Sequence, residues 1–576
     1  MKRNTIGSGV VTRLRTPSSG TPSFGWLGEE LRHTMRTTLA IGSIIVMVAG
    51  CVLLAVPCRA ADQNQATSVI VQGRDMAIAA KAVRGVGGRV THELGVIRAV
   101  GAELTTAQLE RLKRLNPGLR VYANGQAKTS SKESGPEDSY YPELVGARDL
   151  NRSGTYGQGV TIAVLDTGWW SNYDGISEDL RGHHRILAEY DATKDKMGHI
   201  QDLNGHGTHV TSVMACSLRT DDGQPIGVAP GVSLVGIQAF DKEGRGAYTD
   251  VIRGINWVLD NKGRYGIRIL NLSFSAPPHS HYWEDPLNQA VMAAWQAGIV
   301  VVVSAGNNGP SPMTVGVPGN VPYIITVGAM SDNNTPADPS DDFLTSFSST
   351  GPTYEGFVKP DLVAPGGHML GVMSDASLIA KQHPEFARKT KKDHLYIMSG
   401  TSQAAAVVSG VVALMLDVQP WLNPDEVKCH LLSTAHAAVK SDKSLAYSVF
   451  QQGAGMVDAR GAAVSSESGC ANQGLDVAAD VAGTNHFGGY ANRNASGGYY
   501  LTNLTGDGYL WSGGYLWSGA YLWSGGYLWS GGYLWSGGYL WSGAYLWSGS
   551  YPWGGTYAWS AGLVEPVSIN IWVPHE

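Results

Sequence analysis

Cysteine and charge are both scarce in this sequence. The 576 residues include five cysteines, and Asp, Glu, Lys and Arg together make up 16%. Two cysteines, Cys51 and Cys58, lie near the N-terminus, so a chain trimmed there keeps an odd number, which excludes a disulfide-rich scaffold. One disulfide is expected, with Cys429–Cys470 as a first guess at the pair. Because 48 acidic residues outnumber 42 basic ones, the net charge of −6 argues against nucleic-acid binding.

A long apolar run occurs near the N-terminus. It comprises the 18 residues 39–56, preceded by Met35-Arg36 and followed by Cys58-Arg-Ala60. A basic start, an apolar centre and a small-residue end are typical of a secretory signal. Residues 1–61 are therefore a predicted leader with a signal peptide, and Met35 is an alternative start of the chain. Retention as a membrane anchor and a lipoprotein site at Cys51 are alternatives to cleaved export, which we favour.

Three short stretches carry side chains suited to acyl transfer. Ser402 and His206 each lie beside glycine at the start of an expected helix, where unpaired N–H groups favour negative charge. Asp166 ends the β-branched run 160–166, which is an expected parallel strand whose C-terminal edge collects catalytic groups. Together they supply a nucleophile, a general base and an orienting carboxylate. For Ser402 taken alone, a helix-capping role is the alternative.

In their order Asp, His, Ser, these motifs resemble those of the subtilisin-like serine proteases, the subtilases. The stretch 300–309 also resembles the oxyanion-hole strand of this family, with Asn307 as the side-chain amide donor. Connecting segments at 227–230, 347–352 and 359–366 are similar to family segments as well. The resemblance covers roughly residues 140–465 and implies that Asp166, His206 and Ser402 are the catalytic triad.

The fold class that the resemblance implies for residues 136–465 is α/β, a subtilisin-like parallel sheet with helices on both faces. The alternation of apolar patterns predicts the same architecture. We expect strands at 160–166, 232–240, 267–274, 298–305 and 323–329. We expect helices near 206–216, 248–261, 285–297, 402–417 and 424–436.

Residues 62–135 form a separate predicted unit. Strands are expected at 68–72, 89–92, 95–100 and 119–122, and helices at 76–83 and 106–115. This βαββαβ order resembles the ferredoxin-like α+β propeptide of subtilases, which implies an inhibitor of the protease before export. A small interaction domain is the alternative. Self-cleavage is expected within the Ser/Lys/Glu-rich linker 126–138, without a preferred bond.

The resemblance also assigns a pocket for P1, the residue before the cleaved bond. Ser273-Phe274-Ser275 and Ser304-Ala305-Gly306 are expected to flank it, and Phe274 stands where the family often has Leu, which is expected to narrow the pocket. His209 is expected to be structural, because no HExxH motif accompanies it, so no catalytic metal is predicted. No cofactor is expected to be required. The acidic stretch 332–342 offers oxygens for a structural calcium, which subtilases often bind, although we favour a solvated loop.

The sequence changes character after residue 465. Residues 466–508 are a predicted Gly/Asn-rich linker, residues 509–562 repeat Tyr-Leu-Trp-Ser-Gly-Gly, and residues 563–576 are a predicted C-terminal strand. The even period of six puts Tyr and Trp on one face of an extended chain, although stacked hexapeptide coils also suit the period. Exposed aromatic surface favours adhesion to a glycan, a cell surface or another copy. A poorly ordered low-complexity tail is the alternative.

The sequence therefore predicts a secreted serine endopeptidase, made as a self-processed zymogen. Its expected partners are protein or peptide substrates and its own propeptide, with a surface or glycan ligand for the repeat tail. The alternative is a surface-attachment protein that uses the aromatic repeat and whose protease fold has little activity. The presence of all three triad residues favours the protease.

Overall fold

The computed structural model describes residues 66–129, 140–219, 223–335, 338–388, 394–494 and 496–501. All of them belong to one of the chain's two units, Asn64–Glu576, and nothing in the other unit, Met1–Gln63, is described. The predicted leader (1–61), repeat (509–562) and C-terminal strand (563–576) lie outside the described residues and stay predictions.

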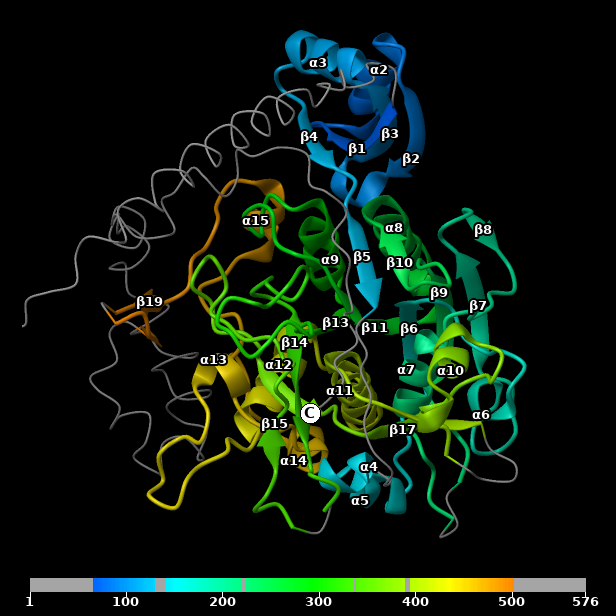
Figure 1. Ribbon diagram of the computed structural model, residues 1–576, viewed down its shortest axis with the longest axis vertical. Coiled ribbons are helices and arrows are strands. Elements are labelled where there is room, and N and C mark those ends of the chain that lie inside the picture. The colour runs from blue at the N-terminus through cyan, green and yellow to red at the C-terminus, as the bar shows by residue number, and fades with distance from the viewer. Residues whose placement is uncertain are drawn as a thin grey trace, which may run out of the picture. The chain divides into compact units, whose positions relative to one another are not determined.

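The N-terminal part of the described chain is a four-stranded antiparallel sheet with two helices (Figure 1). The strands lie in the order β2-β3-β1-β4. Val69 and Val71 of β1 pack against α2 and α3, whereas Ile70 on the opposite face belongs to the core of the larger body. Both faces of the sheet are therefore partly buried. The elements are β1 Ala66–Gln72, α2 Met76–Gly85, β2 Arg89–Leu94, β3 Ala99–Thr105, α3 Thr106–Leu115 and β4 Arg120–Ala123.

This order of elements is the predicted βαββαβ order, with one local difference. Residues 95–100 were expected as one strand, but Gly95–Ile97 form a short 3₁₀ helix, η1. Arg98 then adopts a left-handed conformation with φ 54°, and β3 begins at Ala99. A single residue in this backbone region is enough to interrupt the strand.

The larger body is built on a nine-stranded sheet that is mostly parallel. Its strand order is β15-β14-β13-β11-β6-β9-β7-β8, with β16 paired to β14. Every residue of β6, β13 and β14 is buried, as expected when helices cover both faces of a parallel sheet. The strands are β6 Thr161–Asp166, β7 Ile186–Asp191, β8 Lys196–Met197, β9 Ser233–Gln238, β11 Ile267–Leu272, β13 Val300–Ser304, β14 Ile325–Ser331, β15 Phe343–Leu344 and β16 Leu362–Pro365.

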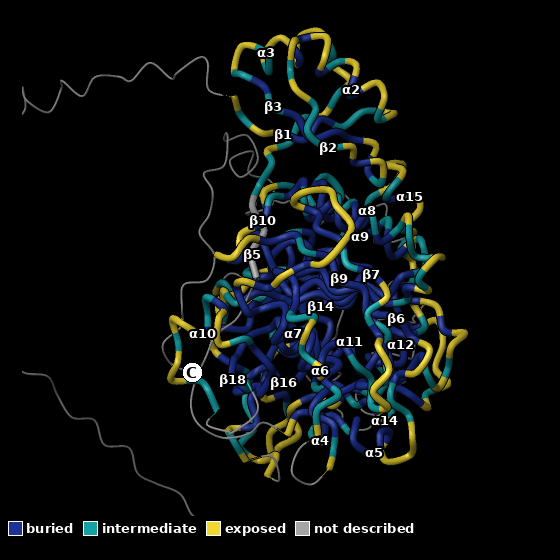
Figure 2. Tube along the Cα trace, turned by 90° about the vertical axis from the view of Figure 1, so that its right-hand side faces the viewer, coloured by how far each residue is buried: buried dark blue, intermediate teal, exposed yellow. Residues whose placement is uncertain are grey.

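Five long helices cover this sheet, and all five were predicted. Helices α8 and α9 lie together on one side of the sheet, and α7 and α11 lie together on the other (Figures 1 and 2). They are α7 His206–Ala215, α8 Tyr248–Tyr265, α9 Pro286–Gln296, α11 Thr401–Val418 and α12 Pro424–Thr434. Among the described residues, α11 is the one helix long and apolar enough to cross a membrane, but 89% of it is buried inside the protein.

Short elements complete the body. The short helices are α4 Tyr141–Leu144, α5 Ala147–Arg152, α6 Asp174–Ser177, α10 Leu378–Gln382, η2 Pro384–Phe386, α13 Val449–Gln452, α14 Ala459–Val464 and α15 Val477–Ala482. The short strands are β5 Gln126–Thr129, β10 Arg245–Ala247, β12 Phe274–Ser275, β17 Met369–Val372, β18 Leu395–Met398, β19 Ala491–Arg493 and β20 Tyr499–Leu501.

Residues 466–501 pack on the body, although 466–508 was expected to be a linker. The disulfide Cys429–Cys470 joins the start of this segment to α12, as guessed from the sequence, and the buried Cys216 lies outside this disulfide. Further along, the Tyr282 and Tyr323 hydroxyls both donate to Asp480 Oδ2. A polar segment is ordered here because its acidic side chain accepts hydrogen bonds from buried donors of the body.

Candidate active site

Asp166 and His206 meet at one edge of the main sheet. Asp166 is the last residue of β6 and His206 is the first residue of α7. His206 Nδ1 lies 2.7 Å from Asp166 Oδ1, and the two side chains are 0% and 1% exposed. A buried carboxylate at this distance fixes the orientation of the imidazole and favours a proton on Nδ1.

The loop after β6 holds the carboxylate in place. The backbone N–H of Thr167 donates to Asp166 Oδ1 at 2.7 Å, and the N–H of Gly207 donates to Thr167 Oγ1 at 2.9 Å. A Cβ on Gly207 would lie 2.1 Å from the Gly168 carbonyl oxygen, so only glycine fits beside the histidine. The glycine that follows His206 in the motif is therefore needed for close packing.

Asp202 holds the start of helix α7, which carries His206, and it was not predicted from the sequence. It accepts hydrogen bonds from the Thr167 hydroxyl, from the Gly205 N–H, and from both the N–H and the hydroxyl of Thr208. Burial raises the pKa of Asp202, and these donors oppose that shift. The carboxylate joins the Asp166 loop to the start of α7. Its only sequence signal is its place four residues before His206.

Ser402 is the second residue of α11 and is fully buried. Its hydroxyl donates to the Ser273 carbonyl oxygen at 3.0 Å, and the Ser273 hydroxyl donates in turn to the Ser402 carbonyl at 3.1 Å. A hydroxyl has a single hydrogen, so Ser402 must release the Ser273 carbonyl before its hydroxyl donates to His206. Catalytic hydrogen bonds often form only once substrate is bound.

Asn307 presents a buried amide nitrogen that has no hydrogen-bond partner among the described residues. Its Oδ1 accepts from the Thr401 N–H at 3.1 Å and from the Thr401 hydroxyl at 2.7 Å. These two bonds orient the amide so that Nδ2 is the free donor. Thr401 directly precedes Ser402, and its part in holding Asn307 was not predicted. A buried unpaired donor costs stability unless a ligand uses it.

The residues assigned to the P1 pocket lie together and are buried. The Ser304 hydroxyl donates to the Phe274 carbonyl at 3.1 Å, which joins the two predicted segments. The Phe274 ring packs against the Phe240 ring with centroids 5.1 Å apart, as part of the core. Whether Phe274 narrows the pocket stays a prediction.

An extended segment of the chain, β5, lies beside this site and is paired with a strand on each side. Strand β5 is the central strand of a small antiparallel sheet, β10-β5-β12 (Figure 1). Thr129 pairs with Phe274, and Ala127 pairs with Gly246. Residues 245–247 and 274–275 therefore bind an extended backbone on both of its sides, next to the Ser273 carbonyl that holds Ser402.

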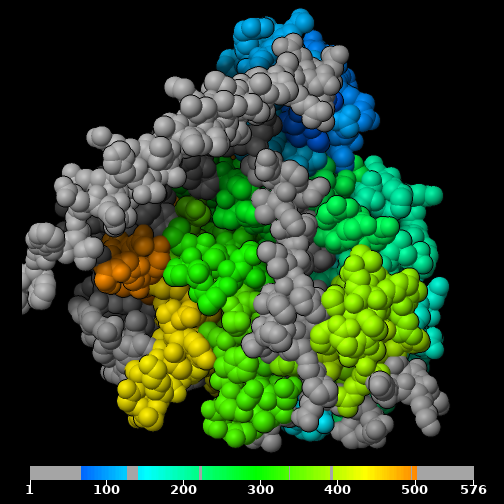
Figure 3. All heavy atoms as spheres, viewed as in Figure 1, coloured from blue at the N-terminus to red at the C-terminus, as the bar shows by residue number. Residues whose placement is uncertain are grey.

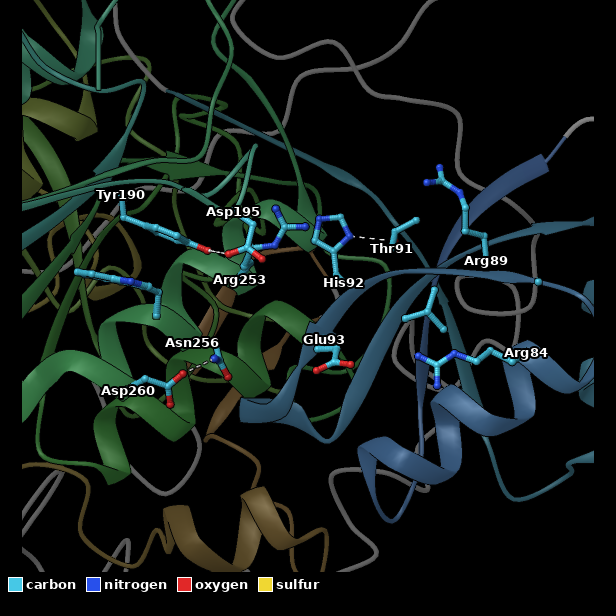
Figure 4. Close-up of a pocket in the computed structure, with 13 residues that line it drawn as sticks. Arg84, Arg89, Thr91, His92, Glu93, Tyr190, Asp195, Arg253, Asn256 and Asp260 are labelled. Atoms are coloured by element: carbon cyan, nitrogen blue, oxygen red, sulfur yellow. Dashed lines mark hydrogen bonds between the residues drawn. The ribbon is translucent and has the colours of Figure 1, made fainter. Parts of the chain in front are cut away.

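The N-terminal unit also contacts α8, through a side chain of its sheet and a backbone N–H of η1. Figure 3 shows the blue atoms of this unit against the green atoms of the body. His92 Nε2 lies 2.8 Å from Asp250 Oδ1, and the Val96 N–H donates to Asn256 Oδ1 at 2.8 Å. A cavity of about 700 Å³ lies between the N-terminal sheet and α8 (Figure 4). Its walls are β2 on one side and Tyr190, Asp195 and α8 on the other, so it lies apart from the triad residues.

Two further predictions concern metals. Burial lowers the pKa of His209 to about 4, and its Nε2 lies 3.1 Å from the Tyr396 carbonyl, which suits a neutral structural histidine. Among the described residues, no group of three His, Cys, Asp or Glu side chains is arranged to hold a metal ion. In the acidic loop, burial and neighbouring aspartates raise the pKa of Asp342 to about 6. Calcium binding by this loop stays a prediction.

Comparison with known proteins identifies relatives of this chain. The model of the subtilase family matches residues 157–456. Serine protease AprX from Bacillus subtilis (strain 168) is 38% identical over 340 residues, which cover 58% of this chain and 73% of AprX. Subtilisin DY from Bacillus licheniformis is 31% identical over 294 residues, covering 51% of this chain and 89% of that protein.

A solved structure has the same fold. It is fervidolysin from Fervidobacterium pennivorans, described as a keratinolytic enzyme related to subtilisin, with 24% sequence identity and a TM-score of 0.56. The match covers 70% of this chain and 61% of that structure. The family match spans the main sheet and the segments that carry Asp166, His206, Ser273, Asn307 and Ser402. The chain belongs to the subtilase family and is a serine-type endopeptidase.

Proposed function

We propose that this chain is made as a secreted precursor and cleaves peptide bonds with a triad of Asp166, His206 and Ser402. The observation that carries the proposal is strand β5, an extended backbone held between β10 and β12 beside Ser273 and Ser402. A site that binds a peptide along both backbone edges suits an endopeptidase, because such binding does not depend on a chain terminus. Proteins and peptides are the substrates.

The proposed reaction follows from the positions of four groups. Ser402 Oγ attacks the carbonyl carbon of the substrate while His206 Nε2 takes the hydroxyl proton, and Asp166 stabilises the resulting imidazolium. Asn307 Nδ2 and the Ser402 N–H donate to the oxyanion, where negative charge develops. The tetrahedral intermediate then expels the amine, which receives the proton from His206. Water, deprotonated by His206, hydrolyses the ester of Ser402 and releases the acid.

Residues 62–135 are the proposed propeptide. Its strand β5 lies where substrate would bind, so this unit blocks the site until the linker is cut and the unit dissociates. The contacts of His92 and Val96 with α8 hold the rest of this unit on the body. Export by the predicted signal peptide places the mature enzyme outside the cell.

The test is expression of the full chain and of its Ser402→Ala variant, followed by intact mass and casein hydrolysis. We expect that only the wild type loses its N-terminal part and digests casein. If both proteins fold and neither is processed or active, the proposed function is wrong. If Ser402→Ala retains full activity, the enzyme is a protease with another nucleophile. The attachment-protein alternative is not favoured, because the family match covers the peptidase body.

A further inference from the structure

Three backbone segments meet beside Ser402 and enclose the space next to it. Residues 273–276 and 304–307 are joined by the bond from the Ser304 hydroxyl to the Phe274 carbonyl, at 3.1 Å. Residues 315–317 are tied to both, because the Gly316 N–H donates to the Ala305 carbonyl at 3.2 Å and the Ala276 N–H donates to the Val317 carbonyl at 2.9 Å. The first segment binds the Ser402 hydroxyl and the second ends at Asn307, so a substrate residue attacked by Ser402 has its side chain among these segments.

Two glycines leave room in this enclosure, and Ser275 occupies it. A Cβ placed on Gly306 would lie 3.0 Å from Ser275 Oγ, and a Cβ placed on Gly316 would lie 3.1 Å from Ser275 Cβ. The hydroxymethyl group of Ser275 therefore lies against both glycines at once. Ser275 is 3% exposed. The side chain of Ser275 thus takes the volume that a large P1 side chain would need.

We propose that Ser275 restricts the P1 position to small side chains, so that this enzyme cleaves after Gly, Ala or Ser. The proposal rests on the proposed function, since it names the substrates of the same site. Protein interiors are close-packed, and a wall of backbone on three sides cannot move aside for a benzyl group. Ser275 acts by excluding large side chains, and takes no part in bond breaking.

The experiment compares peptides that differ only at P1, with Ala, Ser, Leu or Phe there. For the mature wild type we expect kcat/KM to be at least about tenfold higher for Ala and Ser than for Leu and Phe, which is the scale on which pocket size discriminates. Ser275→Gly should raise the ratio of Phe to Ala cleavage at least about tenfold. Ser280→Gly, on the same loop but outside the three segments, should leave the ratio unchanged. A ratio of rates, measured on one preparation of each variant, distinguishes exclusion at P1 from loss of fold.

Two results would overturn the proposal while leaving the protease intact. One is a wild-type enzyme that cleaves after Phe or Leu as well as after Ala. The other is a Phe-to-Ala ratio that does not change in Ser275→Gly. A folded, matured protein that cleaves none of the peptides and no casein would instead overturn the proposed function.

Discussion

Asn307 holds an oriented hydrogen-bond donor that a bound substrate would use. Its Nδ2 is buried and has no partner in the described part of the chain, while Thr401 holds its Oδ1 with two hydrogen bonds. Asn307→Ala removes this donor, and we expect kcat to fall by about 10²–10³-fold, the loss already established for the oxyanion-hole asparagine of subtilisin itself. Asn308→Ala, at the exposed neighbouring position, is the control. An unchanged kcat in folded Asn307→Ala would remove Asn307 from this role.

Lys359 makes stability depend on pH. It is buried with Lys428 around a single acidic side chain, with its Nζ 2.5 Å and Lys428 Nζ 3.0 Å from the Asp361 oxygens. Burial lowers the pKa of Lys359 from 10.5 to about 7, and Lys428 adds to this effect. The folded protein therefore binds fewer protons here than the unfolded chain between these pKa values, so a rise in pH over that window stabilises the fold.

Lys359→Met tests this while leaving Asp361 paired with Lys428. In the inactive Ser402→Ala background, urea unfolding of parent and variant is compared from pH 7 to pH 9.5. We expect the free energy of unfolding of the parent to rise relative to the variant by up to about 1.4 kcal/mol per pH unit, the limit for one proton. A difference that stays constant with pH would contradict a lowered pKa for Lys359.

At the scale of elements, β5 joins the N-terminal unit to the active site. We expect the fragment 62–129, added in trans, to inhibit the mature enzyme. Removal of residues 126–129 should raise the inhibition constant by roughly 10²-fold, since the lost backbone hydrogen bonds contribute about 0.5–1.5 kcal/mol each. Removal of residues 62–65 is the control of equal length. Equal inhibition by both shortened fragments would show that binding depends on other contacts, such as His92 with Asp250.

The long elements could be predicted from the sequence, and the short ones could not. Strands such as 300–304 and helices such as 401–418 are apolar over most of their length, so their hydrophobic pattern identifies them. The sheet β10-β5-β12 pairs two or three residues from distant parts of the chain, and no local pattern encodes such pairing. Strand β7, Ile186–Asp191, was missed because charged and polar residues interrupt its apolar pattern.

The residues of the candidate site also fall into two groups, those that could be predicted from the sequence and those that could not. Asp166, His206, Ser402 and Asn307 stand in motifs with glycine and could be identified by resemblance. Asp202 bonds to neighbours of Asp166 and His206, and Thr401 bonds to Asn307 itself. Nothing in the sequence context of either residue shows where its side chain points. Segment 466–501 looked like a linker because it is polar, but a disulfide and the hydrogen bonds to its buried Asp480 join it to the body.

At the scale of the whole molecule, the described body is followed by the aromatic repeat. Since Asp166, His206, Asn307 and Ser402 all lie within the described body, we expect deletion of residues 505–562 to leave peptide hydrolysis unchanged. We expect the same deletion to weaken attachment to cells or glycan surfaces, because it removes the exposed Tyr and Trp side chains predicted for that binding. Activity and surface binding are measured on the same preparations. Loss of hydrolysis would show that the repeat belongs to the catalytic unit.

The central claim is that Ser402 is activated as a nucleophile by His206 and Asp166, and covalent labelling tests it most directly. The matured enzyme is treated with diisopropyl fluorophosphate, which phosphorylates an activated serine, and the adduct is located by peptide mass. We predict a single adduct on Ser402 that forms in step with the loss of casein hydrolysis and is abolished in His206→Ala. Casein hydrolysis that persists while Ser402 stays unlabelled, or an inactivating adduct on another residue, would contradict the account.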